Sequence, residues 1–286
     1  MYDTVFGGVM QLKRRLKQHG VHALRSMRLL TQVERLYVHW TTRQGQNDNA
    51  KFCREHPDFI PPPMAAIHDA YGATSFRSYW DGGRHTAEWL AGLIHTHHPD
   101  VGRVLEWGCG PARILRHLPE FLPAGTQLFG TDYNQESIAW CKRTIEKITF
   151  SENALSPPLP FEGGSFDVIY AVSVLTHLSA HQQDAWIKEL RRLLRPKGHL
   201  ILTTHGEKSA KVLLPHEYAR FQKDGIVIRG SVEEGTRCFL SYNHPDYAKN
   251  HLFSGMRVCE HIPGHSAEAT SLWGATNVEQ DTWILQ

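Results

Sequence analysis

Short apolar runs alternate with amphipathic stretches through the middle of the chain. The predicted strands are 103–106, 127–131, 148–150, 166–174 and 199–204, and the predicted helices are 112–121, 135–147 and 182–194. The run 166–174 is almost continuously apolar, which is typical of a parallel strand covered on both faces. Regular alternation of strand and helix predicts an α/β fold with a mostly parallel sheet and right-handed crossovers.

The pattern changes after residue 205. Two runs at 226–229 and 236–242 predict an antiparallel hairpin, and a short helix follows near 245–253. Two further strands are expected at 256–262 and 281–285. We therefore predict one domain over 103–286, with a core at 103–205, an insertion at 206–255 and terminal strands at 256–286.

Residues 1–50 predict a basic helical extension. Apolar residues follow one helical face over 1–45, and Gly20 is expected to divide this region into two helices. Residues 1–45 carry a net charge of +6 and the remainder −4, so the rest of the chain lacks the basic surface typical of nucleic-acid binders. The amphipathic region is expected either to pack on its own domain or to contact an anionic membrane or a partner.

Residues 51–102 combine prolines, aromatics and glycines ahead of the first strand. Pro57 to Pro63 predicts an extended approach, residues 71–84 are rich in aromatics and glycine, and a helix is expected at 86–95. Aromatic residues at this density usually belong to a core. Their place before the first strand also permits a lid over a ligand at the sheet edge.

Composition restricts the class of protein further. The chain has 286 residues and no apolar run of about 20 residues, so we expect a cytoplasmic protein without a membrane span. Its five cysteines are scattered and form no Cys-x-x-Cys pair, which predicts neither a disulfide framework nor a zinc site.

The stretch from Arg103 to Arg113 joins the first strand to the first helix through Gly108 and Gly110. A strand, a glycine turn and a helix start form the nucleotide-cradling element of doubly wound folds. A dinucleotide fingerprint requires a third glycine where this chain has Arg113, and no Gly-Lys-Ser/Thr of a phosphate loop follows. The turn therefore favours a nucleotide other than NAD, FAD or a nucleoside triphosphate.

Acidic and amide residues follow the first three predicted strands. Glu106 precedes the glycines and would repel a pyrophosphate, but it suits a ligand with an ammonium or sulfonium group. Asp132 ends the second strand, where it can accept hydrogen bonds from ribose hydroxyls. Asn153 and Ala154 follow the third strand and can read an adenine edge. These residues predict S-adenosyl-L-methionine (SAM) as the cofactor.

The run 103–205 resembles a class I SAM-dependent methyltransferase. The resemblance rests on five motifs: Val104–Arg113, Gly130-Thr-Asp132-Tyr133-Asn134, Pro158–Phe161, Ser165–Leu178 and Leu194–Gly198. The resemblance implies a Rossmann-like seven-stranded sheet with helices on both faces. It adds Cys109, Arg113, Tyr133, Tyr170 and Ala171 to the expected cofactor contacts. A looser resemblance links Leu202–Gly206 and the segments after it to bacterial methyltransferases of glycan or small-molecule pathways.

Two histidines are candidate general bases for methyl transfer to a hydroxyl. His177 follows the fourth strand and His205 the fifth, at the same edge of the sheet. The Asn/Asp-Pro-Pro-Tyr motif of enzymes that methylate nucleic-acid bases is absent, and no acidic ligand lies between Ala171 and Ala180, so we expect no metal. We predict methyl transfer to an oxygen of a small-molecule or sugar-like acceptor, with 206–255 lining the substrate pocket.

Two other classes of function remain open from the sequence. One is a non-catalytic SAM-binding module that docks a partner through residues 1–45. The other is an NAD(P)-dependent oxidoreductase, which Glu106 and Arg113 disfavour. The acceptor and the oligomeric state are not predicted.

Overall fold

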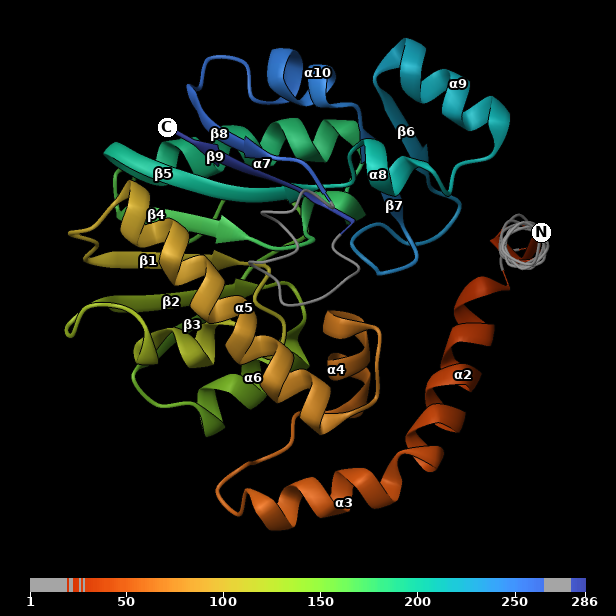
Figure 1. Cartoon of the computed structure of the whole chain (residues 1–286), viewed down its shortest axis with the longest axis vertical. Helices are drawn as coiled ribbons and strands as arrows, with labels where there is room; N and C mark the ends of the chain where they lie inside the picture. Colours follow the sequence, from red (N-terminus) through yellow and green to blue (C-terminus); the bar gives the residue numbers. More distant parts are fainter. Residues whose placement is uncertain (1–19, 21–22, 26, 28, 265–278) are drawn as a thin grey trace, which may run out of the picture.

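The computed structural model describes residues 20, 23–25, 27, 29–264 and 279–286 (Figure 1). Most of the first predicted N-terminal helix lies outside the described residues. The second is present as α2 (Leu30–Gln44), which continues into α3 (Gln46–Glu55). Among the described helices, none combines the length and apolar character needed to cross a bilayer.

A seven-stranded sheet in the order β3-β2-β1-β4-β5-β9-β8 forms the framework. Strands β1 to β5 pair in parallel, and β9 pairs antiparallel with both β5 and β8. The strands are β1 (Arg103–Trp107), β2 (Gln127–Asp132), β3 (Ile148–Glu152), β4 (Phe166–Ala171), β5 (Leu194–Thr204), β8 (Val258–Ile262) and β9 (Asp281–Leu285). The predicted Rossmann-like, mostly parallel sheet is confirmed.

Helices cover both faces of the sheet because neighbouring residues of a strand point to opposite sides. Val104 packs in a core with α5 (Phe76–His97) and α6 (Gln135–Thr144). Its neighbour Leu105 packs in a second core with α7 (Ala180–Leu193) on the other side. Figure 1 shows α5 crossing in front of β1, β2 and β3.

The insertion after β5 forms a separate small layer. Helices α8 (Glu207–Ala210) and α9 (Pro215–Asp224) lead into the antiparallel strands β6 (Ile226–Arg229) and β7 (Leu240–Asn243). This confirms the predicted hairpin, although β7 starts at residue 240, so the connecting loop is longer than expected. A short helix α10 (Pro245–Tyr247) and a π-helical turn η3 (Ala248–Leu252) follow.

The aromatic segment before β1 is helical, which corrects the expectation of a helix at 86–95. Helix α5 begins at Phe76, where the side chain of Ser75 accepts a hydrogen bond from the backbone N–H of Ser78. Tyr79 is fully buried in a cluster with aromatic residues of the preceding helix and loop, so it is a core residue. Within 51–102, both α4 (Met64–Tyr71) and part of α5 reach the carboxyl edge of the sheet, and a lid over this edge stays a prediction.

A glycine inside α5 allows the helix to approach the turn after β1. A Cβ at Gly83 would overlap the backbone carbonyl oxygen of Arg113. The close helix packing that a third glycine provides in dinucleotide-binding turns is thus supplied here by a glycine from α5.

The helix predicted at 112–121 is also shorter than expected. Only Leu115–Glu120 is helical there, as the 3₁₀-helix η1. Pro119 lies inside it and has no N–H to donate, which opposes a regular α-helix. Ala112 precedes it with a φ of 53°, in the left-handed region.

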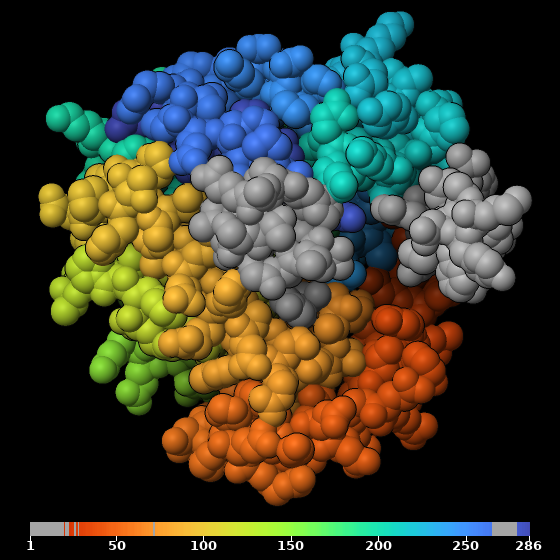
Figure 2. All heavy atoms as spheres, in the orientation of Figure 1, coloured from red at the N-terminus to blue at the C-terminus, as the bar shows by residue number. Residues whose placement is uncertain are grey.

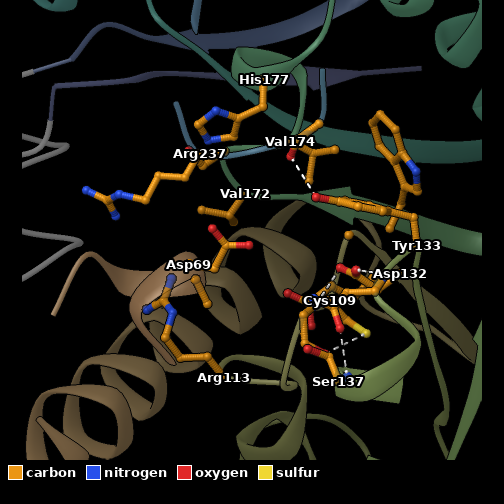
Figure 3. A pocket seen from close by; sticks show the side chains of 18 of the residues that line it. Asp69, Cys109, Arg113, Asp132, Tyr133, Ser137, Val172, Val174, His177 and Arg237 are labelled. Atoms are coloured by element: carbon orange, nitrogen blue, oxygen red, sulfur yellow. Dashed lines mark hydrogen bonds between the residues drawn. The ribbon is translucent and has the colours of Figure 1, made fainter. Parts of the chain in front are cut away.

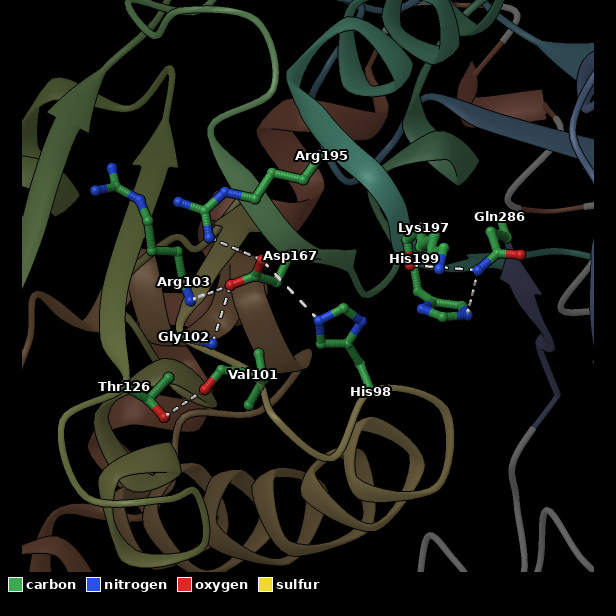
Figure 4. Close-up of polar contacts among 10 residues, drawn as sticks. All are labelled: His98, Val101, Gly102, Arg103, Thr126, Asp167, Arg195, Lys197, His199 and Gln286. Carbon is green, nitrogen blue, oxygen red and sulfur yellow. Dashed lines mark hydrogen bonds and ion pairs between the residues drawn. The ribbon is translucent and has the colours of Figure 1, made fainter.

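Asp167 holds the opposite, amino edge of the sheet together (Figure 4). One carboxylate oxygen accepts hydrogen bonds from the backbone N–H of Gly102 and Arg103 at 2.9 and 2.8 Å, and the other accepts one from Arg195 at 2.8 Å. Burial opposes ionisation, but the hydrogen bonds from Arg195 and the backbone hold the pKa of Asp167 below its usual value. This acid is structural and lies away from the edge where the glycine turn opens.

Candidate active site

Two glycines shape the turn after β1 for different reasons. Gly108 and Gly110 have φ angles of 75° and 51°, which favour glycine. A Cβ at Gly108 would also overlap a methyl group of Val174, whereas one at Gly110 would meet only Ala70 at 3.8 Å. Packing and backbone angle therefore both require Gly108, and the backbone angle alone favours glycine at position 110.

Asp132, at the end of β2, fixes the turn. Its carboxylate accepts hydrogen bonds from the backbone N–H of Gly110 and of Asn134, both at 2.8 Å. Burial raises the pKa of Asp132 above its usual value, although these backbone donors favour the charged form. The carboxylate is held rigidly, and each oxygen keeps a further lone pair for a ligand.

A cavity of about 590 Å³ opens at the carboxyl edge of the sheet, at the switch point between β1 and β4 (Figure 3). The predicted site residues that line it are Glu106, Gly108, Cys109, Gly110, Arg113, Asp132, Tyr133, Asn153, His177 and His205. Ala154, Tyr170 and Ala171 do not line it. Tyr170 and Ala171 are packed in the two cores, and Ala154 is exposed.

Glu106 is a buried acid at the floor of this cavity. It pairs in register with Tyr170 of β4, and its Oε2 and the Tyr170 hydroxyl are buried atoms that no described residue hydrogen-bonds. Burial raises the pKa of Glu106 to about 8, and the neighbouring Tyr170 hydroxyl and, to a smaller extent, the positive charge of Arg113 oppose this shift. A buried carboxyl group with an unused acceptor is a site for a cationic ligand group.

Tyr133 and Asn153 lie near Asp132 at the other end of the cavity. The Tyr133 hydroxyl donates a hydrogen bond to the carbonyl oxygen of Gly235 at 3.1 Å, so its ring spans the gap to the insertion. The amide nitrogen of Asn153 donates to the carbonyl oxygen of Ala154 at 2.6 Å, while its Oδ1 is buried without a partner in the described chain. This end offers a ring face and a spare acceptor, which suit an adenine base.

Both predicted bases have a fixed tautomer. Nδ1 of His177 lies 2.8 Å from the carbonyl oxygen of Phe239, and Nδ1 of His205 lies 3.1 Å from that of Ser241. A carbonyl can only accept, so each Nδ1 carries the proton and each Nε2 keeps its lone pair. Burial lowers the pKa of His177, and burial together with the nearby His177 lowers the pKa of His205 to about 3. Both imidazoles are therefore neutral acceptors.

A polar network that the sequence analysis missed supports the end of β4. Ser173 has a φ of 64°, which is unfavourable for a residue with a Cβ. Its N–H donates to Thr203 at 2.7 Å and its hydroxyl accepts from the Gln280 amide at 2.8 Å. Ser173 and Gln280 both line the cavity, so this strained position belongs to the site.

Asp69 and Arg237 were also missed. The Asp69 carboxylate, from α4, points into the cavity, and no described residue hydrogen-bonds it (Figure 3). Asp69 is an exposed residue, but the cavity wall shields its carboxylate from water, and this desolvation, with the charge of Glu34, raises its pKa to about 6. Arg237 lines the same cavity, but Glu34 of α2 lies 3.2 Å from its guanidinium and neutralises it. No sequence motif marks either residue.

Within the described ranges, no three His, Cys, Asp or Glu side chains are grouped so that they could hold a metal ion. The thiol of Cys109 is buried, and burial raises its pKa well above the usual value, so it is not a ready nucleophile.

The strand order, the glycine turn and the acids at the ends of β1 and β2 together define the class I methyltransferase fold. Residues 104–198 match the family model described as a methyltransferase domain. Residues 104–198 therefore form a methyltransferase domain, as the sequence motifs predicted, and the fold around it is that of the class I SAM-dependent methyltransferases, whose cofactor is SAM. PH0226 from Pyrococcus horikoshii shares this fold with a TM-score of 0.51 at 18% identity, over 74% of this chain and 95% of that one.

Curated relatives carry varied names. A sterol 24-C-methyltransferase from Schizosaccharomyces pombe is 32% identical over 68% of this chain and 56% of its own length. A 27-O-demethylrifamycin SV methyltransferase from Amycolatopsis mediterranei is 28% identical over 48% and 53%. A tRNA N(3)-methylcytidine methyltransferase from S. pombe is 26% identical over 76% of both chains. This chain spans only 53–58% of the length of the first three relatives it matches.

Proposed function

We propose that this protein transfers a methyl group from SAM to an oxygen of a small-molecule or sugar-like acceptor. The observation that carries the proposal is one cavity that places two neutral imidazole acceptors opposite a cofactor-binding edge with Glu106 and Asp132. When bound, SAM supplies a methyl group that its sulfonium already activates, so the chain's residues need only bind, orient and deprotonate the acceptor.

The two ends of the cavity suit the two ends of the cofactor. Glu106 and Arg113 lie at one end, where Glu106 would ionise on pairing with the ammonium of an amino acid and Arg113 would pair with its carboxylate. Asp132 would accept hydrogen bonds from ribose hydroxyls, and Tyr133 and Asn153 would contact the adenine. The fit rests on the unused Oε2 of Glu106 and the unused Oδ1 of Asn153.

His177 is the proposed general base. Its Nδ1–H is held by the carbonyl oxygen of Phe239, which leaves the Nε2 lone pair for an acceptor hydroxyl in the cavity it lines. Because its pKa is lowered, the imidazole is mostly neutral at physiological pH. His205 is the second candidate, but its lower pKa of about 3 makes it the weaker base.

The charges in the acceptor half of the cavity favour a small-molecule acceptor. The acceptor half contains Asp69, the neutralised Arg237–Glu34 pair and the neutral His177, so it carries no free positive charge for a phosphate backbone. The relatives named for sterol and rifamycin substrates act on small molecules by their names. The relative named for tRNA makes RNA the alternative acceptor, which the net charge of −4 outside residues 1–45 disfavours.

Calorimetric titration with SAM and S-adenosylhomocysteine, followed by a methyl-transfer screen, tests the proposal. We expect saturable binding of both compounds and transfer to a hydroxyl-bearing sugar or phenol. Binding of NAD(P) in place of SAM would refute the cofactor assignment. Binding of SAM with transfer only to tRNA would refute the acceptor assignment alone.

Exchange of Arg113 for methionine should weaken S-adenosylhomocysteine binding about 10- to 100-fold, because a charge-assisted bond to the carboxylate is lost. Binding of 5′-methylthioadenosine, which lacks the amino acid, should change less than about twofold by the same principle. The ratio of the two dissociation constants, from calorimetry, checks the assignment. Equal losses for both ligands would show that Arg113 acts on the turn and not on the amino acid.

Cofactor binding should strengthen as pH rises toward 8. The pKa of Glu106 is about 8 in the free protein, so the carboxyl is largely protonated at neutral pH, and a bound ammonium favours its ionised form. Binding then releases a proton, and affinity should rise by up to about tenfold per pH unit below 8 and level off above it. Titrations of S-adenosylhomocysteine from pH 6 to 9 measure this slope. Glu106→Gln should reduce it, and 5′-methylthioadenosine should lack it.

A further inference from the structure

Helix α2 exposes a row of large apolar side chains. Leu29, Val33, Leu36, Tyr37 and Trp40 all lie on its surface, and Leu36 and Trp40 are 71% and 55% exposed. Elsewhere in the described part of the chain, the exposed large apolar side chains are Met27, just before α2, and the isolated Ile60 and Tyr133. Monomeric proteins rarely expose such side chains in a contiguous group, so this row indicates a contact surface.

The opposite side of α2 is fixed to the body of the protein. Glu34 forms an ion pair with Arg237, and its carboxylate also accepts a hydrogen bond from the thiol of Cys238 at 2.7 Å. Val38 and Thr41, which follow at helical spacing from Glu34, are half-buried. Tyr37, at one edge of the row, lies edge-on to His68 of α4 with ring centroids 6.3 Å apart. Together these contacts fix α2 with the rest of the row facing away from its own domain. The helix lies at the edge of the molecule (Figure 1, Figure 2).

Charge along α2 has one sign on the exposed side. Arg35, His39 and Arg43 follow each other at four-residue spacing beside the apolar row, and all three are exposed. The acid within α2 is Glu34, which is already paired with Arg237. An apolar row with Trp and Tyr, bordered by cations, has the pattern of a helix that lies in a membrane interface.

We propose that α2 binds an anionic lipid surface, with its apolar row inserted among the headgroups and its cationic edge on the lipid phosphates. A second copy of this chain is the weaker occupant, because Arg35 and Arg43 beside the row would meet no exposed acid on α2 of the other copy. Arg237 joins Glu34 of α2 to the cavity wall, so lipid-bound α2 places the cavity beside the lipid surface. The inference does not depend on the proposed methyl transfer.

Co-sedimentation of the full chain with lipid vesicles tests this inference. We expect binding to vesicles of phosphatidylcholine and phosphatidylglycerol, and much weaker binding to phosphatidylcholine alone or at high salt. Leu36→Glu or Trp40→Glu should weaken binding at least about tenfold, since each puts a charge in the apolar row. Ile60→Glu is the matched control: Ile60 is 53% exposed but outside α2, so this variant should bind as the parent does.

The same variants distinguish binding to lipid from association with a second copy of the chain. Leu36 and Trp40 are exposed, so their variants should fold, which circular dichroism and S-adenosylhomocysteine binding verify. Sedimentation velocity without lipid should show no change of mass in Leu36→Glu. A dimer that this variant dissociates, an absence of vesicle binding by the parent, or equal loss in Ile60→Glu would each overturn the proposal.

Discussion

Replacement of His177 by alanine should lower kcat about 10²- to 10⁴-fold, the usual contribution of a positioned general base. The affinity for SAM should stay nearly unchanged, because the proposed role of this imidazole is on the acceptor side. Single-turnover methyl transfer to an acceptor found in the screen measures the effect. His205→Ala should cost less, since its pKa of about 3 makes that imidazole the poorer proton acceptor.

The pH profile gives an independent check on His177. Its pKa in the folded protein is lowered by burial, so the fraction of neutral imidazole stays high until the pH falls below the ordinary value of 6.5. At saturating SAM, kcat should therefore be constant from neutral pH to about 6.5 and decline only below it. An acid limb centred above 6.5, or full turnover in both alanine variants, would contradict the assignment of a histidine base.

Asp132→Ala should weaken binding of S-adenosylhomocysteine by about 30- to 1000-fold. Two hydrogen bonds to ribose hydroxyls are lost at about 1–2 kcal/mol each. The substitution also removes the acceptor for the Gly110 and Asn134 N–H groups, which loosens the turn. Because 5′-methylthioadenosine keeps the ribose, it should lose affinity to the same extent, in contrast to the Arg113 variant.

Asp167→Ala is a matched control for Asp132→Ala. Asp167 also accepts hydrogen bonds from two backbone N–H groups, but at the amino edge of the sheet. Its loss should lower the denaturation midpoint and leave cofactor affinity nearly unchanged. Comparable loss of cofactor affinity in both variants would mean that Asp132 acts through general stability and not through the ribose.

The turn that forms one end of the candidate site could be predicted from sequence because local geometry determines it. Gly108, Gly110 and Asp132 belong to two short segments that adjacent parallel strands bring together, and strand order follows from the βαβ alternation. Glu106 was predicted from its position before the glycines. Its unpaired oxygen depends on Tyr170, a neighbour set by strand register, and was not visible in the sequence.

The acceptor end could not be predicted in the same way. Asp69, Arg237 and Gln280 come from segments far apart in the chain, and only tertiary packing brings them to one cavity. The start of α5 at Phe76 was also missed, since glycines such as Gly83 usually disfavour a helix. Here the helix keeps Gly83 because a larger residue would collide with the turn.

Both imidazoles are anchored to the inserted hairpin and not to the sheet that carries them. The Nδ1–H groups of His177 and His205 donate hydrogen bonds to the carbonyl oxygens of Phe239 and Ser241. The backbone N–H groups of Gly235 and Asn243 in turn donate to the carbonyl oxygens of the same two histidines. A hairpin exchanged from a homologous enzyme would therefore alter the aim of the base as well as the walls around the acceptor. Attempts to redesign substrate choice by such grafts should preserve these four reciprocal bonds, or transplant each histidine together with its carbonyl partner.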